Sequence, residues 1–252
     1  MRTSVGVVRN WRLSDVDGER EPMNAASLVK LIIGHLALFL VFDLDAPIHD
    51  NISTRHVLSH TTGLPNWRPA GRELTPLRPP GVRWGYSGEG FVLLQSHLEH
   101  LAGQPIDELA ARSVFEPLGV TDSRFERPEP GFHGYRPLFT TAGDFGRFLA
   151  HVLALDDERW RPQVGIDSEL AWGAGWGLEL SPLLHGWQWG QNPDAGNFVI
   201  GRPKTGSGVV VFTDDPNGGR PSYRGIVEEH LPGDHPSLRV EHNPTFLALT
   251  KD

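Results

Sequence analysis

The most apolar run of the chain extends from Leu31 to Phe42 and contains one ionisable side chain, that of His35. This run falls short of the roughly 20 apolar residues that a membrane span needs. Its apolar side chains lie on every face of a helix, which is typical of a helix enclosed by other elements. We therefore expect a central buried helix that begins at about Ser27, with its first turn deep in the protein.

That first turn carries a serine and a lysine three residues apart, Ser27 and Lys30. Residues i and i+3 share one face of a helix, so the Lys30 amine can reach the Ser27 hydroxyl and accept its proton. Such a pair also occurs often by chance, and a solvated helix start is the alternative interpretation. Ser27 is thus a candidate nucleophile whose assignment depends on the rest of the chain.

Composition limits the classes of protein that this chain can represent. Its 252 residues can bury a substantial core as one large domain or two packed lobes. The formal net charge of −8, without a cluster of basic residues, argues against a nucleic-acid partner. The chain has no cysteine, which excludes disulfides, thiolate metal sites and a cysteine nucleophile.

The N-terminal segment 1–9 contains no apolar core of signal-peptide length. We therefore expect a cytoplasmic protein, or an exported one whose leader has been removed. No transmembrane segment is expected.

Helical and strand patterns occur in separate blocks along the sequence. A strand is expected over 4–9 and a polar, turn-like stretch over 12–24. Helices are expected over 53–59, 88–101 and 105–115 and from near Thr141, and strands over 176–180, 187–189, 196–201 and 207–213. This order predicts an α/β protein of the α+β type, in which an antiparallel sheet and its helices are segregated.

We expect a single domain over 1–252 with an active site between two lobes. The α/β lobe is expected to comprise about 1–44 and 160–252, and the mostly helical lobe about 45–159.

A tyrosine in a loop before a predicted helix is the second candidate for chemistry. Tyr86 begins the sequence Tyr-Ser-Gly at 86–88. A lysine ammonium nearby can stabilise its phenolate, which would make the phenol a proton shuttle. The alternative is a loop aromatic that caps the core and whose hydroxyl is only hydrogen-bonded.

Three segments in this order resemble the serine β-lactamase and penicillin-binding-protein superfamily: Ser27 to Lys30, His-Thr-Thr-Gly-Leu-Pro at 60–65, and Tyr86 to Gly88. The sequence is most similar to the class C-like branch, which includes esterases and D-amino-acid peptidases, and the similarity spans most of the chain. The resemblance implies a β-lactamase-like fold in which Ser27 is the nucleophile, Lys30 takes its proton and Tyr86 is the acid/base. It implies no metal and no organic cofactor.

The third catalytic box of the superfamily is Lys-Thr-Gly or His-x-Gly on a strand beside the site. A literal match occurs at 204–206, but the preceding Pro203 suits a turn better than a central strand. Gln-Trp-Gly at 188–190 resembles a variant of the box and is preferred here. The resemblance then implies an oxyanion hole formed by the backbone N–H groups of Ser27 and Gln191. It places substrate contacts at Gly88, Gln188, Trp189, Gly190 and Asn192.

Two departures from the family pattern bear on the substrate. Gly88 stands where relatives have an asparagine, which makes β-lactam hydrolysis doubtful. Gln188 replaces a cation that would attract a substrate carboxylate, so an uncharged ester or amide is favoured. Trp67 and Trp189 fall near the site motifs, as do Trp84 and Trp187, and are either walls of an apolar acyl pocket or ordinary core residues.

We therefore expect a serine hydrolase that forms an acyl-enzyme on a small-molecule substrate. Small esters come first, D-amino-acid amides or peptides second and β-lactams third. The alternative is a catalytically weak or inactive scaffold of the same fold that binds a ligand or partner. The departures at Gly88 and Gln188, and a helix after Lys30 that is shorter than in relatives, motivate this alternative. The oligomeric state is left open.

Two further chemistries are rejected on sequence grounds. The segment 85–89 ends in glutamate, so it does not match the Gly-x-Ser-x-Gly nucleophile elbow of α/β-hydrolases. His56 and His60 have zinc-ligand spacing but lack the glutamate of a metalloprotease motif, and local hydrogen bonding is expected for both.

Overall fold

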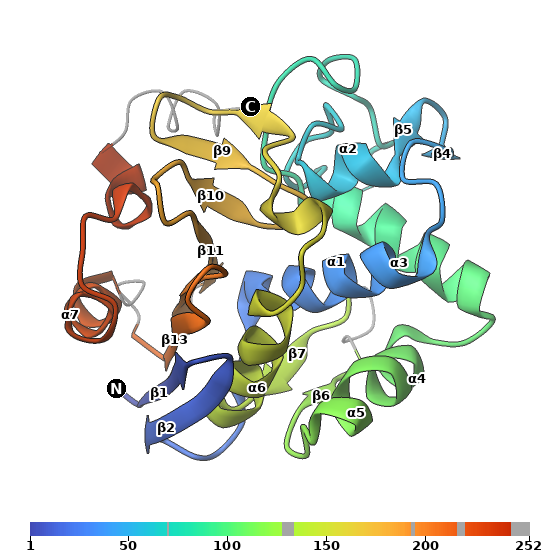
Figure 1. The fold of residues 1–252 in the computed structure, drawn as a ribbon. Helices are drawn as coiled ribbons and strands as arrows, with labels where there is room; N and C mark the ends of the chain where they lie inside the picture. Colours follow the sequence, from blue (N-terminus) through green and yellow to red (C-terminus); the bar gives the residue numbers. More distant parts are fainter. Residues whose placement is uncertain (70, 128–133, 193–194, 216–219, 243–252) are drawn as a thin grey trace.

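A computed structural model describes residues 1–69, 71–127, 134–192, 195–215 and 220–242 (Figure 1). Its centre is an eight-stranded sheet in the order β2-β1-β13-β12-β11-β10-β9-β8, and all neighbouring strands are antiparallel. The strands are β1 (Thr3–Arg9), β2 (Arg12–Gly18), β8 (Val164–Gly165), β9 (Leu170–Trp172), β10 (Gly177–Glu179), β11 (His185–Asn192), β12 (Ala195–Arg202) and β13 (Ser207–Thr213). The predicted antiparallel sheet with flanking helices is confirmed.

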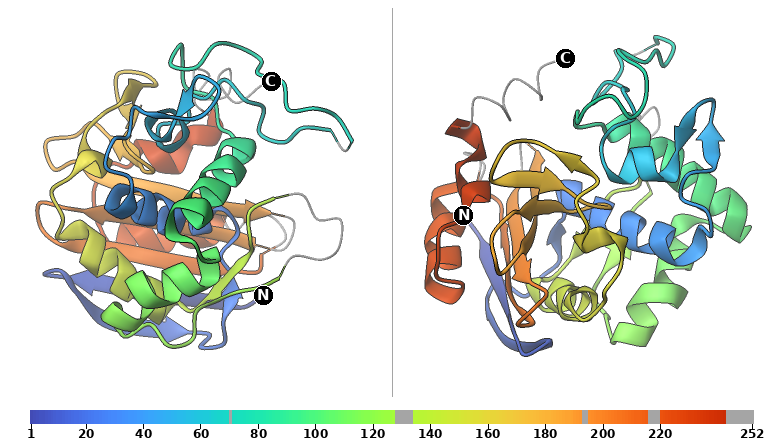
Figure 2. Two further views of the ribbon diagram at one scale, coloured as in Figure 1. Left: turned by 90° about the vertical axis from the view of Figure 1, so that its right-hand side faces the viewer. Right: turned by 45° about the horizontal axis from the view of Figure 1, so that its top comes forward.

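Helices cover both faces of this sheet (Figure 2). On one face α6 (Ala142–Leu153) packs against β1, β2 and β13, and on the other α7 (Arg220–His230) packs against β12 and β13. The helix predicted from near Thr141 is α6, and the Thr141 side chain caps it by accepting a hydrogen bond from the Asp144 backbone. No element was predicted over 220–230.

The middle of the chain forms the remaining helices and two small sheets. The helices and helical turns are η1 (Ala26–Leu28), α1 (Val29–Leu40), α2 (Thr54–Leu58), α3 (Gly88–Ala102), α4 (Ile106–Ala110), the π-helical η2 (Ala111–Phe115), α5 (Glu116–Leu118), η3 (Glu158–Trp160) and η4 (Pro236–His242). The small sheets pair β3 (Met23–Asn24), β7 (Leu138–Thr140) and β6 (Arg124–Phe125), and β4 (Pro47–His49) with β5 (Ile52–Ser53). The helices predicted over 53–59, 88–101 and 105–115 are therefore present.

The apolar helix α1 is enclosed over its first turns, where Leu31, Ile33 and Leu36 are buried. Its far end is different, because Phe39 is 74% exposed and Phe42 is also exposed. The expectation of a helix enclosed on every face is therefore wrong for the last turn. The first turn still lies deep in the protein, where η1 contacts β11 and β12.

The stretch 12–24 was predicted to be turn-like, but it contains β2 and β3. Strand β2 is an edge strand, and its pairing with β1 shifts register between Val7 and Val8. This irregularity puts the two apolar residues of β2, Leu13 and Val16, three positions apart instead of two or four. The alternation that signals a strand is therefore lost from the sequence.

One hydrophobic cluster joins the middle of the chain to the sheet. It includes Leu94 of α3, Phe148 of α6 and Val210 of β13. A second cluster, with Val209 and Val227, lies beneath α7. The division into an α/β lobe and a helical lobe stays a prediction, although α6, assigned to the helical lobe, packs on the sheet.

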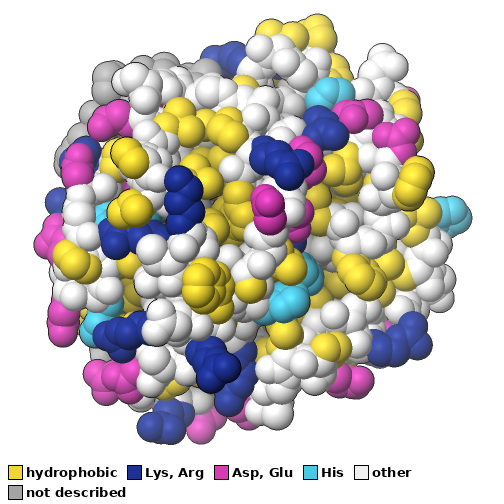
Figure 3. Space-filling view, viewed as in Figure 1, with side chains coloured by type: hydrophobic (Ala, Val, Ile, Leu, Met, Phe, Trp, Pro, Cys, Tyr) yellow, Lys and Arg dark blue, Asp and Glu magenta, His cyan; other side chains and the backbone are white. Residues whose placement is uncertain are grey.

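The surface is mixed in charge. On the face shown in Figure 3, acidic and basic side chains are interspersed. Among the described residues, no helix combines the length and apolar character that crossing a membrane requires.

Candidate active site

The first turn before α1 lies against strand β11 because that strand has a glycine at the point of contact. A Cβ on Gly190 would lie 2.4 Å from the carbonyl oxygen of Ala25 and 2.9 Å from Cγ of Leu28. Only glycine allows so close an approach without displacing the backbone. Gly190 thereby sets the position of Ser27 beside the sheet.

The backbone just before Ser27 is held in a strained conformation. Ala26 has φ of 46°, in the left-handed region that residues with a Cβ seldom adopt. Such a residue costs of order 1–3 kcal/mol and persists only where its surroundings fix it. Here Asn24 Oδ1 accepts a hydrogen bond from the Ala26 backbone at 2.8 Å, and Asn197 Nδ2 donates to the Asn24 carbonyl at 2.8 Å.

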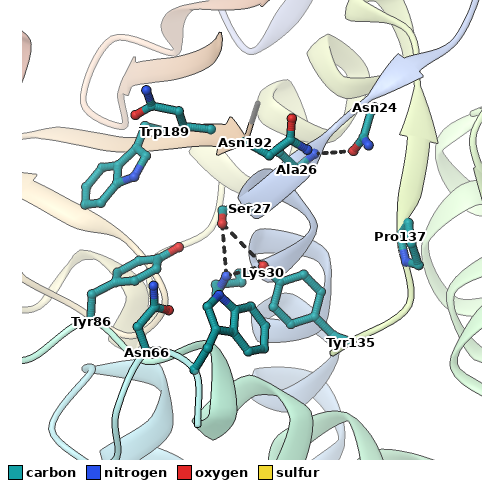
Figure 4. A pocket seen from close by; sticks show the side chains of 12 residues that line it. Asn24, Ala26, Ser27, Lys30, Asn66, Tyr86, Tyr135, Pro137, Trp189 and Asn192 are labelled. Atoms are coloured by element: carbon teal, nitrogen blue, oxygen red, sulfur yellow. Dashed lines mark hydrogen bonds between the residues drawn. The ribbon is translucent and has the colours of Figure 1, made fainter. Parts of the chain in front are cut away.

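Lys30 lies one turn after Ser27 and is fully buried. Its Nζ donates to Ser27 Oγ at 3.1 Å and to Tyr135 Oη at 2.6 Å (Figure 4). Burial by itself lowers the pKa of Lys30, but interactions with Tyr135 and Tyr86 raise it above its ordinary value. In this arrangement Lys30 Nζ is the hydrogen-bond donor to both oxygens.

The hydroxyl of Tyr86 points toward Ser27 from the opposite side of the cavity to Tyr135 (Figure 4). It is buried, and it interacts with both Ser27 and Lys30. Burial raises the pKa of Tyr86 more than the charge of Lys30 lowers it, so the phenol stays protonated. Its ring stacks on Trp189, with centroids 5.3 Å apart.

His60 supports the loop that carries Tyr86. Its ring lies 4.3 Å from the Tyr86 ring, and its Nδ1 accepts a hydrogen bond from the Ser87 backbone at 3.2 Å. Burial, followed by the charge of Lys30, lowers the pKa of His60 well below its ordinary value, so the imidazole is neutral. His56 hydrogen-bonds Ser53 in a capping box. Local hydrogen bonding was predicted for both histidines, and both show it.

Tyr135 is the residue of this site that sequence reasoning missed. It precedes β7, and its Oη lies 3.3 Å from Ser27 Oγ as well as 2.6 Å from Lys30 Nζ. The only indication in the sequence is that the chain has three tyrosines, two of which lie outside the recognised motif. No local pattern connects position 135 with Ser27.

These side chains surround a cavity of about 540 Å³. It is lined by Asn24, Ala26, Ser27, Lys30, Asn66, Trp67, Tyr86, Tyr135, Pro137, Trp189, Gln191 and Asn192. The cavity therefore combines aromatic walls, several carboxamides and the Ser27–Lys30 pair.

A family model described as Beta-lactamase matches residues 7–229. The chain belongs to the Beta-lactamase family. No curated protein matches the sequence.

Solved structures with the same fold have low sequence identity to this Beta-lactamase family member. An octameric penicillin-binding protein homologue from Pyrococcus abyssi is 16% identical over 96% of this chain and 76% of that one, with a TM-score of 0.76. A D-stereospecific amidohydrolase from Streptomyces sp. is 17% identical over 92% and 94%, with a TM-score of 0.73. A Beta-lactamase/D-alanine carboxypeptidase from Yersinia pestis complexed with citrate is 17% identical over 84% and 87%, with a TM-score of 0.67. These similarities show the fold.

The structure of this Beta-lactamase family member brings Ser27, Lys30 and Tyr86 together. Of the residues predicted on β11, Trp189, Gln191 and Asn192 line the same cavity. The role of the backbone N–H groups of Ser27 and Gln191 as an oxyanion hole stays a prediction.

Gln188 does not line the cavity, contrary to the substrate contact expected for it. Successive side chains of a strand point to opposite faces, and Gln188 shares the inward face with Gly190 while Trp189 faces the cavity. Its side chain is fully buried, and its Oε1 accepts a hydrogen bond from the Trp189 backbone at 3.0 Å. A direct contact of this side chain with substrate does not fit that placement.

Gly88 does not line the cavity either, but it shapes the cavity through its neighbours. A Cβ on Gly88 would lie 2.5 Å from the Trp67 ring. The Gly88 N–H donates to Oδ1 of Asn66 at 3.0 Å, which holds the Asn66 carboxamide at the cavity wall (Figure 4). Position 88 thus has no side-chain carboxamide, and the carboxamide of Asn66 lies beside it at the cavity wall.

The literal Lys-Thr-Gly match lies in the turn between β12 and β13, as the proline before it predicted. Lys204 Nζ donates to the carbonyl of Pro182 at 2.7 Å, away from the cavity lining. Among the tryptophans near the motifs, Trp67 and Trp189 line the cavity, whereas Trp84 and Trp187 are buried core residues.

Glu179, His185 and His235 form a buried group with metal-ligand spacing. Nδ1 of His185 and Nδ1 of His235 lie 2.9 and 3.0 Å from the same Glu179 oxygen. Binding a metal through Nδ1 would place the His185 proton on Nε2, but Arg202 Nε already donates to that atom at 2.5 Å. Two donors would then face each other, so this group suits a hydrogen-bonded ion pair and not a metal centre.

Proposed function

We propose that this protein is a serine hydrolase that forms an acyl-enzyme on Ser27. The observation that carries the proposal is the hydrogen bond from buried Lys30 to Ser27 Oγ, 3.1 Å long, at a cavity that also receives two tyrosines. A hydroxyl placed beside a buried cation and phenols is the arrangement that nucleophilic catalysis requires. Family membership supports the same reaction class.

In the proposed reaction, Ser27 attacks a carbonyl carbon and the carbonyl oxygen becomes negatively charged. Ser27 lies in the first turn of a helical segment, where backbone N–H groups have no intrahelical acceptor. Its N–H and that of Gln191 are the proposed donors to the oxyanion. Lys30 donates hydrogen bonds to Ser27 Oγ and Tyr135 Oη, and its protonated form stabilises negative charge on these oxygens.

The cavity favours an uncharged substrate. Trp67 and Trp189 supply aromatic walls, and Lys30 is the one cation among the described residues that line it. A substrate carboxylate would have no second cation to pair with. We therefore place small esters first, D-amino-acid amides or peptides second and β-lactams third. The structural similarity to a D-stereospecific amidohydrolase from Streptomyces sp. supports the second class.

Exposure to a fluorophosphonate, followed by intact mass measurement, tests the proposal together with hydrolysis of p-nitrophenyl acetate and butyrate. The wild type should gain one adduct and turn over the esters, and Ser27→Ala should lose both. Lys30→Ala should lose turnover by at least about a hundredfold, whereas the matched control Lys204→Ala should retain it. A folded wild type that gains no adduct and hydrolyses no ester would contradict the proposal and favour a binding scaffold.

A further inference from the structure

We propose that Tyr135 is a catalytic residue that carries the proton of Ser27 to the leaving group. The inference rests on the proposed function and adds a residue that the family motifs do not contain. It follows from the hydrogen bonds at the Tyr135 oxygen and from the contacts that hold the phenol in place.

The Tyr135 oxygen is the acceptor best placed for the proton of Ser27. It lies 3.3 Å from Ser27 Oγ and receives a hydrogen bond of 2.6 Å from Lys30 Nζ. Lys30 Nζ is the donor to both oxygens in this arrangement, and its protonated form has no lone pair with which to accept a proton. The Tyr86 hydroxyl also interacts with Ser27 and Lys30, from the other side of the cavity. Tyr135 Oη therefore lies within hydrogen-bond distance of both the nucleophile and the buried amine.

The hydroxyl group of Tyr135 accepts one proton and donates another, so it returns to its starting state. A phenol has one O–H and two lone pairs, and in the proposed relay the lone pairs of Tyr135 accept from Lys30 and Ser27. As Ser27 Oγ bonds to the carbonyl carbon, its proton passes to Tyr135 Oη. The original Tyr135 proton passes to the leaving-group oxygen or nitrogen as its bond to carbon breaks. In deacylation, water donates a proton to Tyr135 and Tyr135 returns one to Ser27.

The surroundings hold Tyr135 in place before a substrate binds. Its ring lies 5.6 Å from the Trp67 ring, and Lys30 Nζ lies 4.2 Å from the ring centre. The next residue, Arg136, donates its backbone N–H to Gln95 of α3 at 3.0 Å and its guanidinium to Asp107 of α4 at 2.5 Å. A group fixed in this way acts without paying the entropy of orientation during the reaction.

Two esters with one acyl group separate proton relay from a structural role. Phenyl butyrate and p-nitrophenyl butyrate form the same acyl-enzyme but differ in how much their leaving groups need protonation. Tyr135→Phe keeps the ring and removes the hydroxyl. It should lower kcat/KM for phenyl butyrate by about a hundredfold to ten-thousandfold, which is the usual contribution of general acid–base catalysis. For p-nitrophenyl butyrate, whose leaving group needs less protonation, the fold loss of kcat/KM should be at least about tenfold smaller.

The matched variant is Tyr86→Phe, measured on both esters, with thermal unfolding of each variant as the folding control. Equal losses of kcat/KM on the two esters with Tyr135→Phe, or no loss, would overturn the proposal. A leaving-group-dependent loss found with Tyr86→Phe instead would overturn it as well. Fluorophosphonate labelling of wild-type Ser27 separates the two hypotheses. If Ser27 is not labelled, the proposed function fails, and if it is labelled, the ester comparison tests Tyr135 alone.

Discussion

At the scale of single residues, Gly88 determines how the tyrosine loop meets the cavity wall. The Trp67 ring occupies the space that a Cβ at position 88 would need, and Trp67 is 41% exposed. An exposed ring can move outward, so a larger residue at position 88 should disturb the cavity more than the fold.

Gly88→Ala should therefore lower stability by less than the roughly 1–3 kcal/mol typical of overpacking in an enclosed core. It should lower kcat/KM for p-nitrophenyl butyrate by about tenfold to a hundredfold, because a displacement of about 1 Å in a site can have that effect. In a Trp67→Ala background the same change should have a smaller effect on kcat/KM, which a double-mutant cycle measures. Equal effects in both backgrounds would show that Trp67 does not transmit the change.

Residues related by local geometry could be predicted from the sequence, and residues related only by tertiary contact could not. Ser27 and Lys30 face each other because they are three positions apart in a helical turn. Tyr135 reaches the same atoms across 105 positions, through a loop fixed by contacts with α3 and α4. The burial of Gln188 depends on which face of β11 points outward, and the motif alone left that face unassigned.

At the scale of elements, the buried Glu179 group joins two strands to the segment after α7. Glu179 on β10 accepts hydrogen bonds from His185 on β11 and from His235. Ser237 donates to the second carboxylate oxygen at 2.5 Å. Burial raises the pKa of Glu179, but the hydrogen bonds from His185, His235 and Ser237 have the larger combined effect and lower the pKa to about 2. Burial lowers the pKa of His235, but Glu179 and the Leu231 carbonyl raise it above its ordinary value.

These two shifts predict a pH window for the stability that the group provides. The contribution of Glu179 is present above its ordinary pKa of 4.5 and is lost as pH falls through about 2. The contribution of His235 is present below its ordinary pKa of 6.5 and is lost as pH rises through its raised pKa. The difference in Tm between wild type and His235→Gln should be largest between these two ordinary values and smaller on both sides.

Thermal unfolding at constant ionic strength across this pH range measures that difference. His230→Gln changes a histidine near the same segment without touching the group, and its Tm difference from wild type should not follow the same curve. A difference for His235→Gln that is constant with pH would show that the ion pair does not contribute as proposed.

Elements with regular patterns were predictable, and elements with broken patterns were not. The strand predicted over 207–213 is β13, because an unbroken β-branched run between turn residues leaves few alternatives. Strand β2 was missed because its register shift removes the alternation between Leu13 and Val16.

At the scale of the whole molecule, the cavity is built from segments that are distant in sequence. Asn66 and Tyr86 come from the middle of the chain, Gln191 comes from the sheet, and Ser27 lies between them. The hydrophobic cluster that contains Leu94, Phe148 and Val210 joins the same parts. The order of helical and strand blocks predicted the fold class, but the distances across the cavity depend on this packing.

Because one cluster joins the middle of the chain to the sheet, we expect a single cooperative unfolding transition in urea. Tryptophan fluorescence and far-UV circular dichroism should give the same midpoint, as two-state unfolding requires. Trp11→Phe removes a partly exposed indole outside the cluster and should leave the agreement unchanged. A fluorescence change that precedes the loss of ellipticity would indicate that the two lobes unfold separately.

The order of the strands also bears on how the molecule behaves in a crowded solution. A sheet of eight strands has two edges, and an unprotected edge offers backbone groups to the next molecule. In the described part of the chain, one edge is β2, which exposes Arg12, Asp15 and Asp17, and the other is β8, which is two residues long. Charge at one border and brevity at the other discourage strand-to-strand aggregation, so the fold can carry an extended sheet without seeding its growth.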